Sequence, residues 1–156
     1  MARYEATVAS RRGAADTFDY MATFSNAAQW DPGTLAAEQL DPGPVRAGTR
    51  FRLNVAFGGR GMPLTYRITR YQPPREVVLA AANGLLRGTD RIVVADGDGD
   101  GDGDGVRVRY EAEVVLRGPL RLLDPLLRRG FDAVGERAAA GLARALAETS
   151  RGEPAP

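Results

Sequence analysis

Apolar and polar residues alternate along much of the chain before its last third. The alternation is clearest over residues 50–57 and 106–117, where every second side chain is apolar. Because successive side chains of a strand point to opposite faces, this period of two predicts half-buried β-strands. Other segments with a strand pattern are residues 4–9, 35–40, 62–69, 77–79 and 87–95. The connections between them are short, which predicts one antiparallel sheet of seven strands.

Two short helices are predicted between the first strand and the second. Apolar residues fit a helical spacing within residues 14–23. Ser25 or Asn26 is a candidate N-cap for a second helix that ends near Trp30. The tripeptide at 31–33, Asp-Pro-Gly, is a turn signal that stops this helix.

The last third of the chain predicts a long amphipathic helix. Asp124-Pro125 interrupts it and has two interpretations. Pro125 kinks the helix, or Asp124 is an N-cap with Pro125 at the first helical position after a short turn. The apolar stripe recurs at steps of three and four over about seven turns: Leu120, Leu123, Leu127, Phe131, Val134, Ala138, Leu142 and Leu146.

These elements predict an α+β fold in a single domain over residues 1–149, followed by a disordered tail at 150–156. One amphipathic helix has to cover one face of a curved seven-stranded sheet. A sheet this wide curls around the helix and leaves a gap between the two, which the short helices close at one end. Gaps of this kind are typical sites for small ligands.

Composition excludes several kinds of chemistry. The chain has no Cys and no His, and all 21 of its basic residues are Arg. Thiolate, imidazole and Lys Schiff-base mechanisms are therefore absent, and we expect no metal and no cofactor. A net charge of +1 argues against nucleic-acid binding. Without an apolar leader or a membrane-length apolar run, we expect a cytoplasmic protein, monomeric or homodimeric.

The element order and several short strings resemble the START-like superfamily, also called SRPBCC, and in particular its polyketide cyclase/dehydrase-like members. The resemblance covers residues 3–148 and implies a helix-grip fold with an internal cavity for lipids, polyketides or other apolar molecules. It implies no single activity, since carriers, sensors, regulators and enzymes share this fold. The strings are Phe18-Asp19-Tyr20, Trp30-Asp31-Pro32, Gly48-Thr49-Arg50-Phe51, Tyr66-Arg67-Ile68-Thr69, Pro73-Pro74-Arg75 and Gly118-Pro119-Leu120.

Candidate ligand-binding residues are those on the faces expected to point inward, with Trp30 expected near the mouth of the cavity. Plain core packing is the alternative for each of them. Tyr66 and Tyr110 are the stronger candidates, because a buried phenol needs a hydrogen-bond partner that a ligand could supply. Gly130 leaves room in the middle of the long helix. The full set is Trp30, Phe51, Phe57, Leu64, Tyr66, Asp90, Tyr110, Leu127 and Phe131.

Asp90 is the candidate for acid–base chemistry. It shares strand parity with Ile92 and Val94, so it is expected either to face inward or to lie solvated at the rim, near the start of its strand. A carboxyl group in an apolar pocket has a raised pKa and can act as an acid or a base. With Tyr66 or Tyr110 it would form the catalytic set of a metal-free cyclase or dehydratase.

The remaining charged residues have simpler interpretations. Arg and Glu residues on the polar strand faces, such as Arg109 and Glu111, predict a solvated outer surface with cross-strand ion pairs. The Asp-Gly repeats at 96–105 formally fit a calcium-loop pattern. The strand that follows would carry Glu111 about 23 Å from Asp104 at ~3.3 Å per residue, so we interpret the run as a connector.

Three functions remain open from the sequence. The first is a non-catalytic protein that binds or carries an apolar small molecule. The second is an enzyme of the cyclase or dehydratase type, which a buried Asp90 would favour. The third is a partner-binding regulatory protein, which a large exposed apolar patch would indicate. The Arg-bearing long helix could also lie on a membrane, but the sheet needs its apolar face and we expect no stable insertion.

Overall fold

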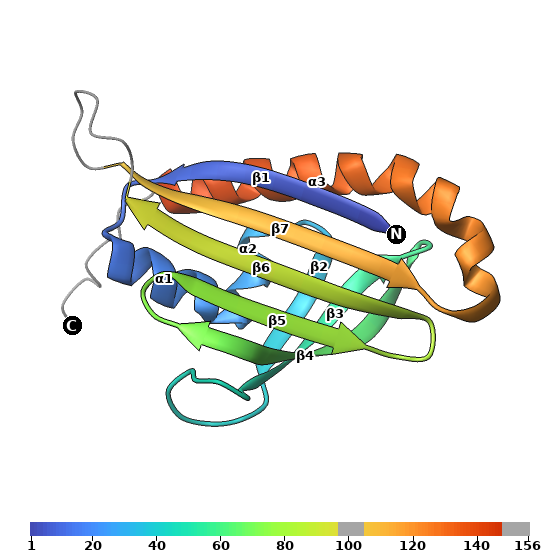
Figure 1. Cartoon of the computed structure of the whole chain (residues 1–156), viewed down its shortest axis with the longest axis horizontal. Coiled ribbons are helices and arrows are strands. Elements are labelled where there is room, and N and C mark those ends of the chain that lie inside the picture. Colours follow the sequence, from blue (N-terminus) through green and yellow to red (C-terminus); the bar gives the residue numbers. More distant parts are fainter. Residues whose placement is uncertain (97–104, 148–156) are drawn as a thin grey trace.

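The computed structural model describes residues 1–96 and 105–147, and it contains one curved sheet, three α-helices and two 3₁₀ turns in that part of the chain (Figure 1). The strands are β1 (Ala2–Ser10), β2 (Thr34–Gln39), β3 (Arg50–Phe57), β4 (Arg60–Gln72), β5 (Glu76–Ala82), β6 (Leu86–Asp96) and β7 (Val106–Leu116). The helical elements are α1 (Ala14–Ala22), η1 (Phe24–Asn26), α2 (Ala27–Trp30), η2 (Gly118–Leu123) and α3 (Asp124–Ala147).

All seven strands belong to one antiparallel sheet in the order β1-β7-β6-β5-β4-β3-β2. The chain therefore runs as a meander from β2 to β7, and β1 joins the free edge of β7. The sheet curls, α3 runs along its β1 side, and α1 and α2 fill one end (Figure 1). The predicted α+β helix-grip arrangement is confirmed.

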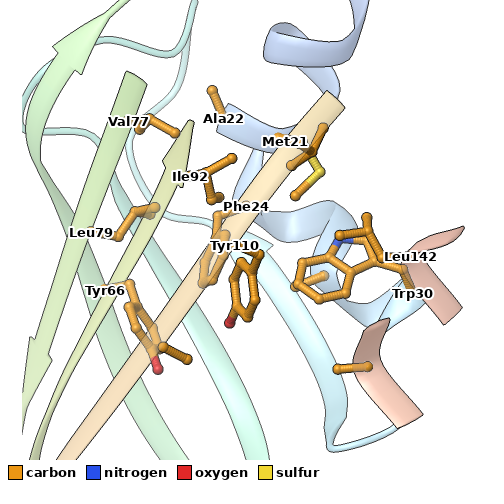
Figure 2. Close-up of a cluster of buried hydrophobic side chains, with 14 of the residues drawn as sticks. Met21, Ala22, Phe24, Trp30, Tyr66, Val77, Leu79, Ile92, Tyr110 and Leu142 are labelled. Carbon is orange, nitrogen blue, oxygen red and sulfur yellow. The ribbon is translucent and has the colours of Figure 1, made fainter. Parts of the chain in front are cut away.

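The core lies on the concave face of the sheet, where the period-two residues meet α1, α2 and the second half of α3. Val77 and Ile92 are fully buried there, in one cluster with Met21 of α1 (Figure 2). Trp30 at the end of α2 lies beside Leu142 of α3 (Figure 2). Along the strands, the apolar residues of the alternating pattern thus face this core and the polar residues lie on the outer face of the sheet.

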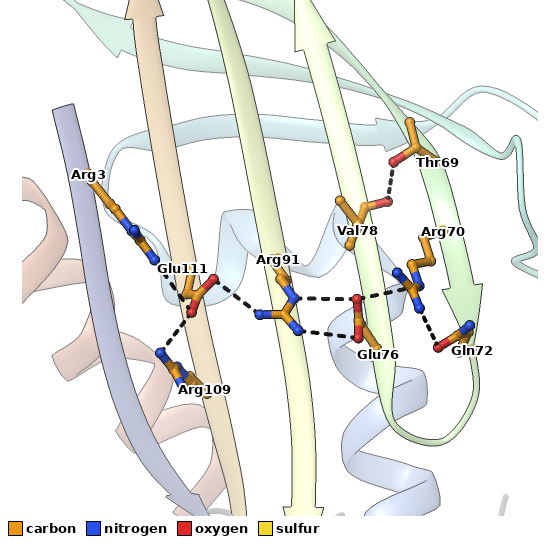
Figure 3. Close-up of polar contacts among 9 residues, drawn as sticks. All are labelled: Arg3, Thr69, Arg70, Gln72, Glu76, Val78, Arg91, Arg109 and Glu111. Carbon is orange, nitrogen blue, oxygen red and sulfur yellow. Dashed lines mark hydrogen bonds and ion pairs between the residues drawn. The ribbon is translucent and has the colours of Figure 1, made fainter. Parts of the chain in front are cut away.

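The convex face carries a chain of ion pairs across five neighbouring strands, from Arg3 of β1 to Arg70 of β4 (Figure 3). Glu111 of β7 lies 3.0 Å from Arg109 and 3.5 Å from Arg91 of β6. Arg91 in turn lies 3.4 Å from Glu76 of β5, which is 3.6 Å from Arg70 of β4. These are the expected cross-strand pairs, and the exposure of the Arg side chains limits each to about 1 kcal/mol or less.

Two local predictions at helix ends were wrong. Asn26 precedes α2, but its side chain does not cap the helix and instead donates a hydrogen bond to the Tyr20 carbonyl, at 3.0 Å. Asp124 is helical itself, and its carboxylate pairs with the amino group of Met1 rather than with the backbone of α3. The second interpretation of Pro125 holds otherwise, because a short 3₁₀ turn precedes α3 and Pro125 lies in the first turn of the helix.

Two glycines bring α3 against the rest of the molecule. A methyl group at Gly135 would overlap the ring of Tyr4 on β1, and one at Gly141 would overlap the backbone carbonyl of Trp30. The helix is therefore closely packed from Gly135 onwards. Its first turns are not, and Leu126 stays 66% exposed while Leu122 just before the helix is 84% exposed.

Other predictions fall on residues outside the described ranges. These are the connector at 96–105, apart from its first and last residues, and the tail at 150–156. Over residues 1–96 and 105–147, no helix combines the length and the apolar character that crossing a bilayer would require.

The glycines of α3 provide a test of this packing. Gly141→Ala places a methyl group against backbone that cannot move aside, and we expect it to lower the free energy of unfolding by about 1–3 kcal/mol or more. Gly130→Ala meets no atom within 4 Å, and we expect it to raise the same quantity by roughly 0.5–1 kcal/mol through helix propensity. Urea denaturation measures whether each substitution lowers or raises the free energy of unfolding. Equal effects would contradict the close approach at Gly141.

Candidate functional site: a cavity under the first turns of α3

A cavity of about 340 Å³ lies between the concave face of the sheet and the first half of α3. Its floor comes from strands β3, β4, β6 and β7, its roof from α3, and one end from α2 and the turn after it. Phe57, Leu126 and Val134 line it and remain substantially exposed, so they mark its mouth. The lining is mostly apolar, and the aromatic side chains in it are Tyr4, Phe24, Trp30, Phe57, Tyr66, Tyr110 and Phe131.

Small residues create the space. Gly88 and Ala112 face inward from neighbouring strands β6 and β7, and Gly130 faces the cavity from α3. A Cβ atom at Gly88 would lie 3.4 Å from the Tyr66 hydroxyl oxygen. The absence of a side chain at Gly88 therefore gives that hydroxyl room to point into the cavity.

Asp90, Tyr110 and Tyr66 form a polar cluster in this apolar surface. Asp90 lies opposite Ala112, and Tyr110 lies opposite Ile92, so Asp90 and Tyr110 are diagonal neighbours on one face of the β6–β7 pair. The Tyr110 hydroxyl donates a hydrogen bond of 2.8 Å to Oδ2 of Asp90. Asp90 is only 6% exposed.

The Tyr66 hydroxyl lies on the next strand but one and has no hydrogen-bond partner among the described residues. Its ring is 8% exposed and packs against Phe24, with ring centroids 5.1 Å apart. Tyr66 and Tyr110 point their hydroxyl ends in a similar direction (Figure 2). Because Tyr66 is on the cavity wall, an occupant of the cavity can supply a hydrogen-bond partner to this hydroxyl.

Asp31 brings a second carboxyl group to the cavity wall. It follows α2, and its carboxylate accepts hydrogen bonds from the Gly33 amide at 2.8 Å and from the Thr34 hydroxyl at 2.9 Å. This local turn holds the side chain in place. Burial raises the pKa of Asp31, and the two hydrogen bonds lower it in part.

Burial controls the protonation of the cluster. The pKa of Asp90 is raised to about 7, and desolvation is the main cause. The hydrogen bond from Tyr110 lowers this pKa in part, and the charge of Asp31 raises it further. Desolvation also raises the pKa of Tyr66 and Tyr110 well above the ordinary value, and the charge of Asp90 adds to both shifts. Both phenols are therefore neutral near pH 7, while the carboxyl group of Asp90 is poised between its two forms.

The structure brings eight of the nine predicted ligand-binding residues to the cavity wall. Phe51 is the exception, because it is fully buried against Phe24 in the closed core. Trp30 is on the wall but not at the mouth, since it is buried and packs edge-on against Tyr110 at 5.5 Å. Those on the wall are Trp30, Phe57, Leu64, Tyr66, Asp90, Tyr110, Leu127 and Phe131.

Asp90 faces inward near the middle of the sheet, which decides between the two positions considered from the sequence. Sequence reasoning missed Asp31 and Gly88. Asp31 was interpreted only as part of a turn, and a turn does not indicate which way its carboxylate points. Parity with Asp90 places Gly88 on the inner face, and this signal in the sequence could have identified it.

Comparison with known proteins gives a consistent result. A family model described as polyketide cyclase/dehydrase and lipid transport matches residues 1–147. A START superfamily protein from Mycobacterium smegmatis has a TM-score of 0.72 at 13% identity, over 94% of this chain and 97% of that chain. The ZhuI aromatase/cyclase from Streptomyces sp. R1128 has a TM-score of 0.70 at 18% identity, over 92% and 90%. No functionally curated protein matches significantly. At these identities the structural likeness supports the fold alone.

The buried carboxyl group predicts that stability falls as pH rises. In the unfolded chain Asp90 ionises near its ordinary pKa of 3.8, whereas in the folded protein its pKa is about 7. Between these values the folded state binds more protons than the unfolded state, so the free energy of unfolding decreases with pH. From pH 5 to pH 8 we expect this group to remove roughly 2–3 kcal/mol, measured by urea denaturation.

Asp90→Asn is the control for this prediction, because Asn can accept the same hydrogen bond from Tyr110 but cannot ionise. The stability of the variant relative to the wild type should increase from pH 5 to pH 8. A constant difference over this range would mean that Asp90 is solvated in the folded protein.

Proposed function

We propose that this chain, which belongs to the polyketide cyclase/dehydrase and lipid transport family, binds an apolar small molecule in the cavity under α3. The polar end of the molecule would lie against Asp90, Tyr66 and Tyr110. Its apolar body would occupy the space between the sheet and the helix. Membership of the family is compatible with this function, and the geometry of the cavity is what argues for it.

The observation that carries the proposal is the combination of an apolar wall with a few convergent polar groups. A volume of about 340 Å³ is within the range of small-ligand sites. The unpartnered Tyr66 hydroxyl and the free oxygen of Asp90 both face this space. Both groups are on the cavity wall, so a ligand in this space can hydrogen-bond to them.

The first turns of α3 provide the route of entry. Leu126 and Val134 lie at the mouth and are exposed, while the helix beyond Gly135 is closely packed. A ligand that enters here buries these exposed apolar side chains together with its own surface. The loose packing of this half of the helix therefore has a direct use in binding.

Acid–base catalysis is a second candidate function, and one observation favours it. Asp90 is buried in an apolar site with a pKa raised to about 7, so near neutral pH it can both accept and return a proton. Tyr110 holds its carboxyl group in position from one side, and the Tyr66 hydroxyl is available to donate a hydrogen bond to a developing oxyanion. This set fits proton abstraction beside a carbonyl group.

Occupation of the cavity can be tested with N-phenyl-1-naphthylamine, an apolar probe that is uncharged at neutral pH. We expect it to bind and to change the emission of Trp30, the single Trp of the chain, which lies on the cavity wall. Gly130→Phe should weaken binding by about tenfold by filling the mouth. The expected loss is specific to the cavity because position 130 is otherwise open space.

Ala133→Phe is the matched control, since Ala133 is exposed on the same helix and does not line the cavity. It should bind the probe as the wild type does. Equal affinities for all three proteins, or no change in Trp30 emission at saturation, would contradict binding in this cavity.

Catalysis can be tested without a known substrate by using 5-nitrobenzisoxazole. A carboxylate takes the proton from its carbon 3, the electrons of that C–H bond complete a nitrile, and the N–O bond breaks to release a cyanophenolate. Because the base form is required, the rate should rise with pH through an apparent pKa of about 7. Asp90→Asn should abolish this rise while the probe of the preceding experiment still binds. A rate independent of Asp90 would argue against this second function.

A further inference from the structure

The charges of the cavity wall are all of one sign. Asp90 and Asp31 are its two ionisable carboxyl groups, and no Arg side chain lines it. The chain contains no Lys and no His. Arg91 and Arg109 of the sheet pair with carboxylates on the convex face, away from the cavity (Figure 3). The site therefore holds negative charge without an internal counterion.

The elements around Asp90 contribute only neutral or acidic side chains to the cavity wall. Facing groups are Tyr110 from β7, Tyr66 from β4, Tyr4 from β1 and Asp31 from the turn after α2. The side chains that α3 contributes to the cavity are all uncharged, among them Leu127, Phe131 and Ala138. None of these groups can neutralise an ionised Asp90, and Asp31 opposes its ionisation.

Aromatic residues line the same space. Trp30 and Tyr110 meet edge-on at 5.5 Å, and Phe24 and Tyr66 are tilted at 5.1 Å. Aromatic rings attract cations through the negative potential of their faces, most strongly where water is excluded. Carboxyl groups among aromatic rings are thus suited to a cation and are unfavourable to an anion.

We propose that the ligand of this cavity is an apolar amine, whose protonated nitrogen pairs with Asp90 beneath the hydroxyl groups of Tyr66 and Tyr110. This inference rests on the proposed binding function and specifies its ligand class. The ammonium group supplies the counterion that the wall lacks, and it can also donate a hydrogen bond to the free Tyr66 oxygen. An anionic lipid would add negative charge near Asp31 and would oppose the ionisation of Asp90, so the cavity disfavours it.

The test compares three naphthalene ligands of one shape: 2-(1-naphthyl)ethylamine, 2-(1-naphthyl)ethanol and 1-naphthylacetic acid. Isothermal titration calorimetry at pH 6 should give the tightest binding for the amine, by about tenfold over the alcohol, and the weakest for the acid. Asp90→Asn should reduce the affinity for the amine to that for the alcohol. Tyr110→Phe should preserve the order of the three ligands, since the carboxyl group remains.

Proton release provides a second measurement that needs no variant. With a pKa of about 7, Asp90 is mostly protonated at pH 6, and it must ionise to pair with the ammonium group. Titrations in buffers of different ionisation enthalpy should therefore show close to one proton released per amine bound. The alcohol should release none.

The outcomes separate the two proposals. Binding of the alcohol with no preference for the amine, or without proton release on amine binding, overturns the amine inference and leaves the binding function intact. Tightest binding of the acid overturns it as well. Failure of all three ligands to bind contradicts the binding function itself, and the inference with it.

Discussion

The position of α3 depends on two places where the helix comes too close to its neighbours to carry a side chain. Gly135 faces the ring of Tyr4, and Gly141 faces the carbonyl of Trp30. Close packing at these points holds the second half of the helix against β1 and α2, and buries Leu142 and Leu146. The first turns of the helix, which Asp124 and Arg128 tie to Met1, leave space between their apolar side chains and the sheet. The cavity is the space that results.

The polar cluster lies in the wall of this cavity, and it reduces the stability of the empty protein. Protein interiors pack as densely as organic crystals, so the side chains that line an empty cavity lose van der Waals contacts. The protein also leaves a hydroxyl group of Tyr66 without a partner and a carboxyl group of Asp90 out of water. The cost of the carboxyl group grows as pH rises above its ordinary pKa, because the unfolded chain then ionises more readily than the folded protein. A ligand that fills the volume and meets these groups removes both costs, which gives binding its driving force.

Much of the fold could be predicted from the sequence, because each strand has one buried face and one solvated face. The parity of Phe51, Asp90 and Tyr110 is a local property, and all three lie on the inner face, although for Asp90 the sequence also allowed a solvated position at the rim. Parity does not show how far α3 stands off from each position. Phe51 therefore proved to be closed core, whereas Asp90 lies in open cavity. That distinction depends on contacts between distant segments, such as Gly141 with Trp30, which no local pattern encodes.

The partners of the polar side chains at helix ends were the least predictable feature. Asp124 and Asn26 have the residue types of helix caps, but their side chains pair elsewhere, with the amino group of Met1 and the carbonyl of Tyr20. Short polar side chains can satisfy their hydrogen bonds in several ways that differ little in free energy. The packing of the helices in the folded protein selects among these alternatives.

The buried carboxyl group links the two functions considered for the cavity. A carboxyl group with a pKa near 7 is a competent base only while nothing neutralises its charge. An ammonium ligand lowers that pKa by pairing, which stabilises the carboxylate and weakens it as a base. A neutral carbonyl compound would leave the base free to act. Binding of an amine and proton abstraction from a carbon acid therefore make opposite demands on Asp90, and the charge of the natural ligand decides which of them this site performs.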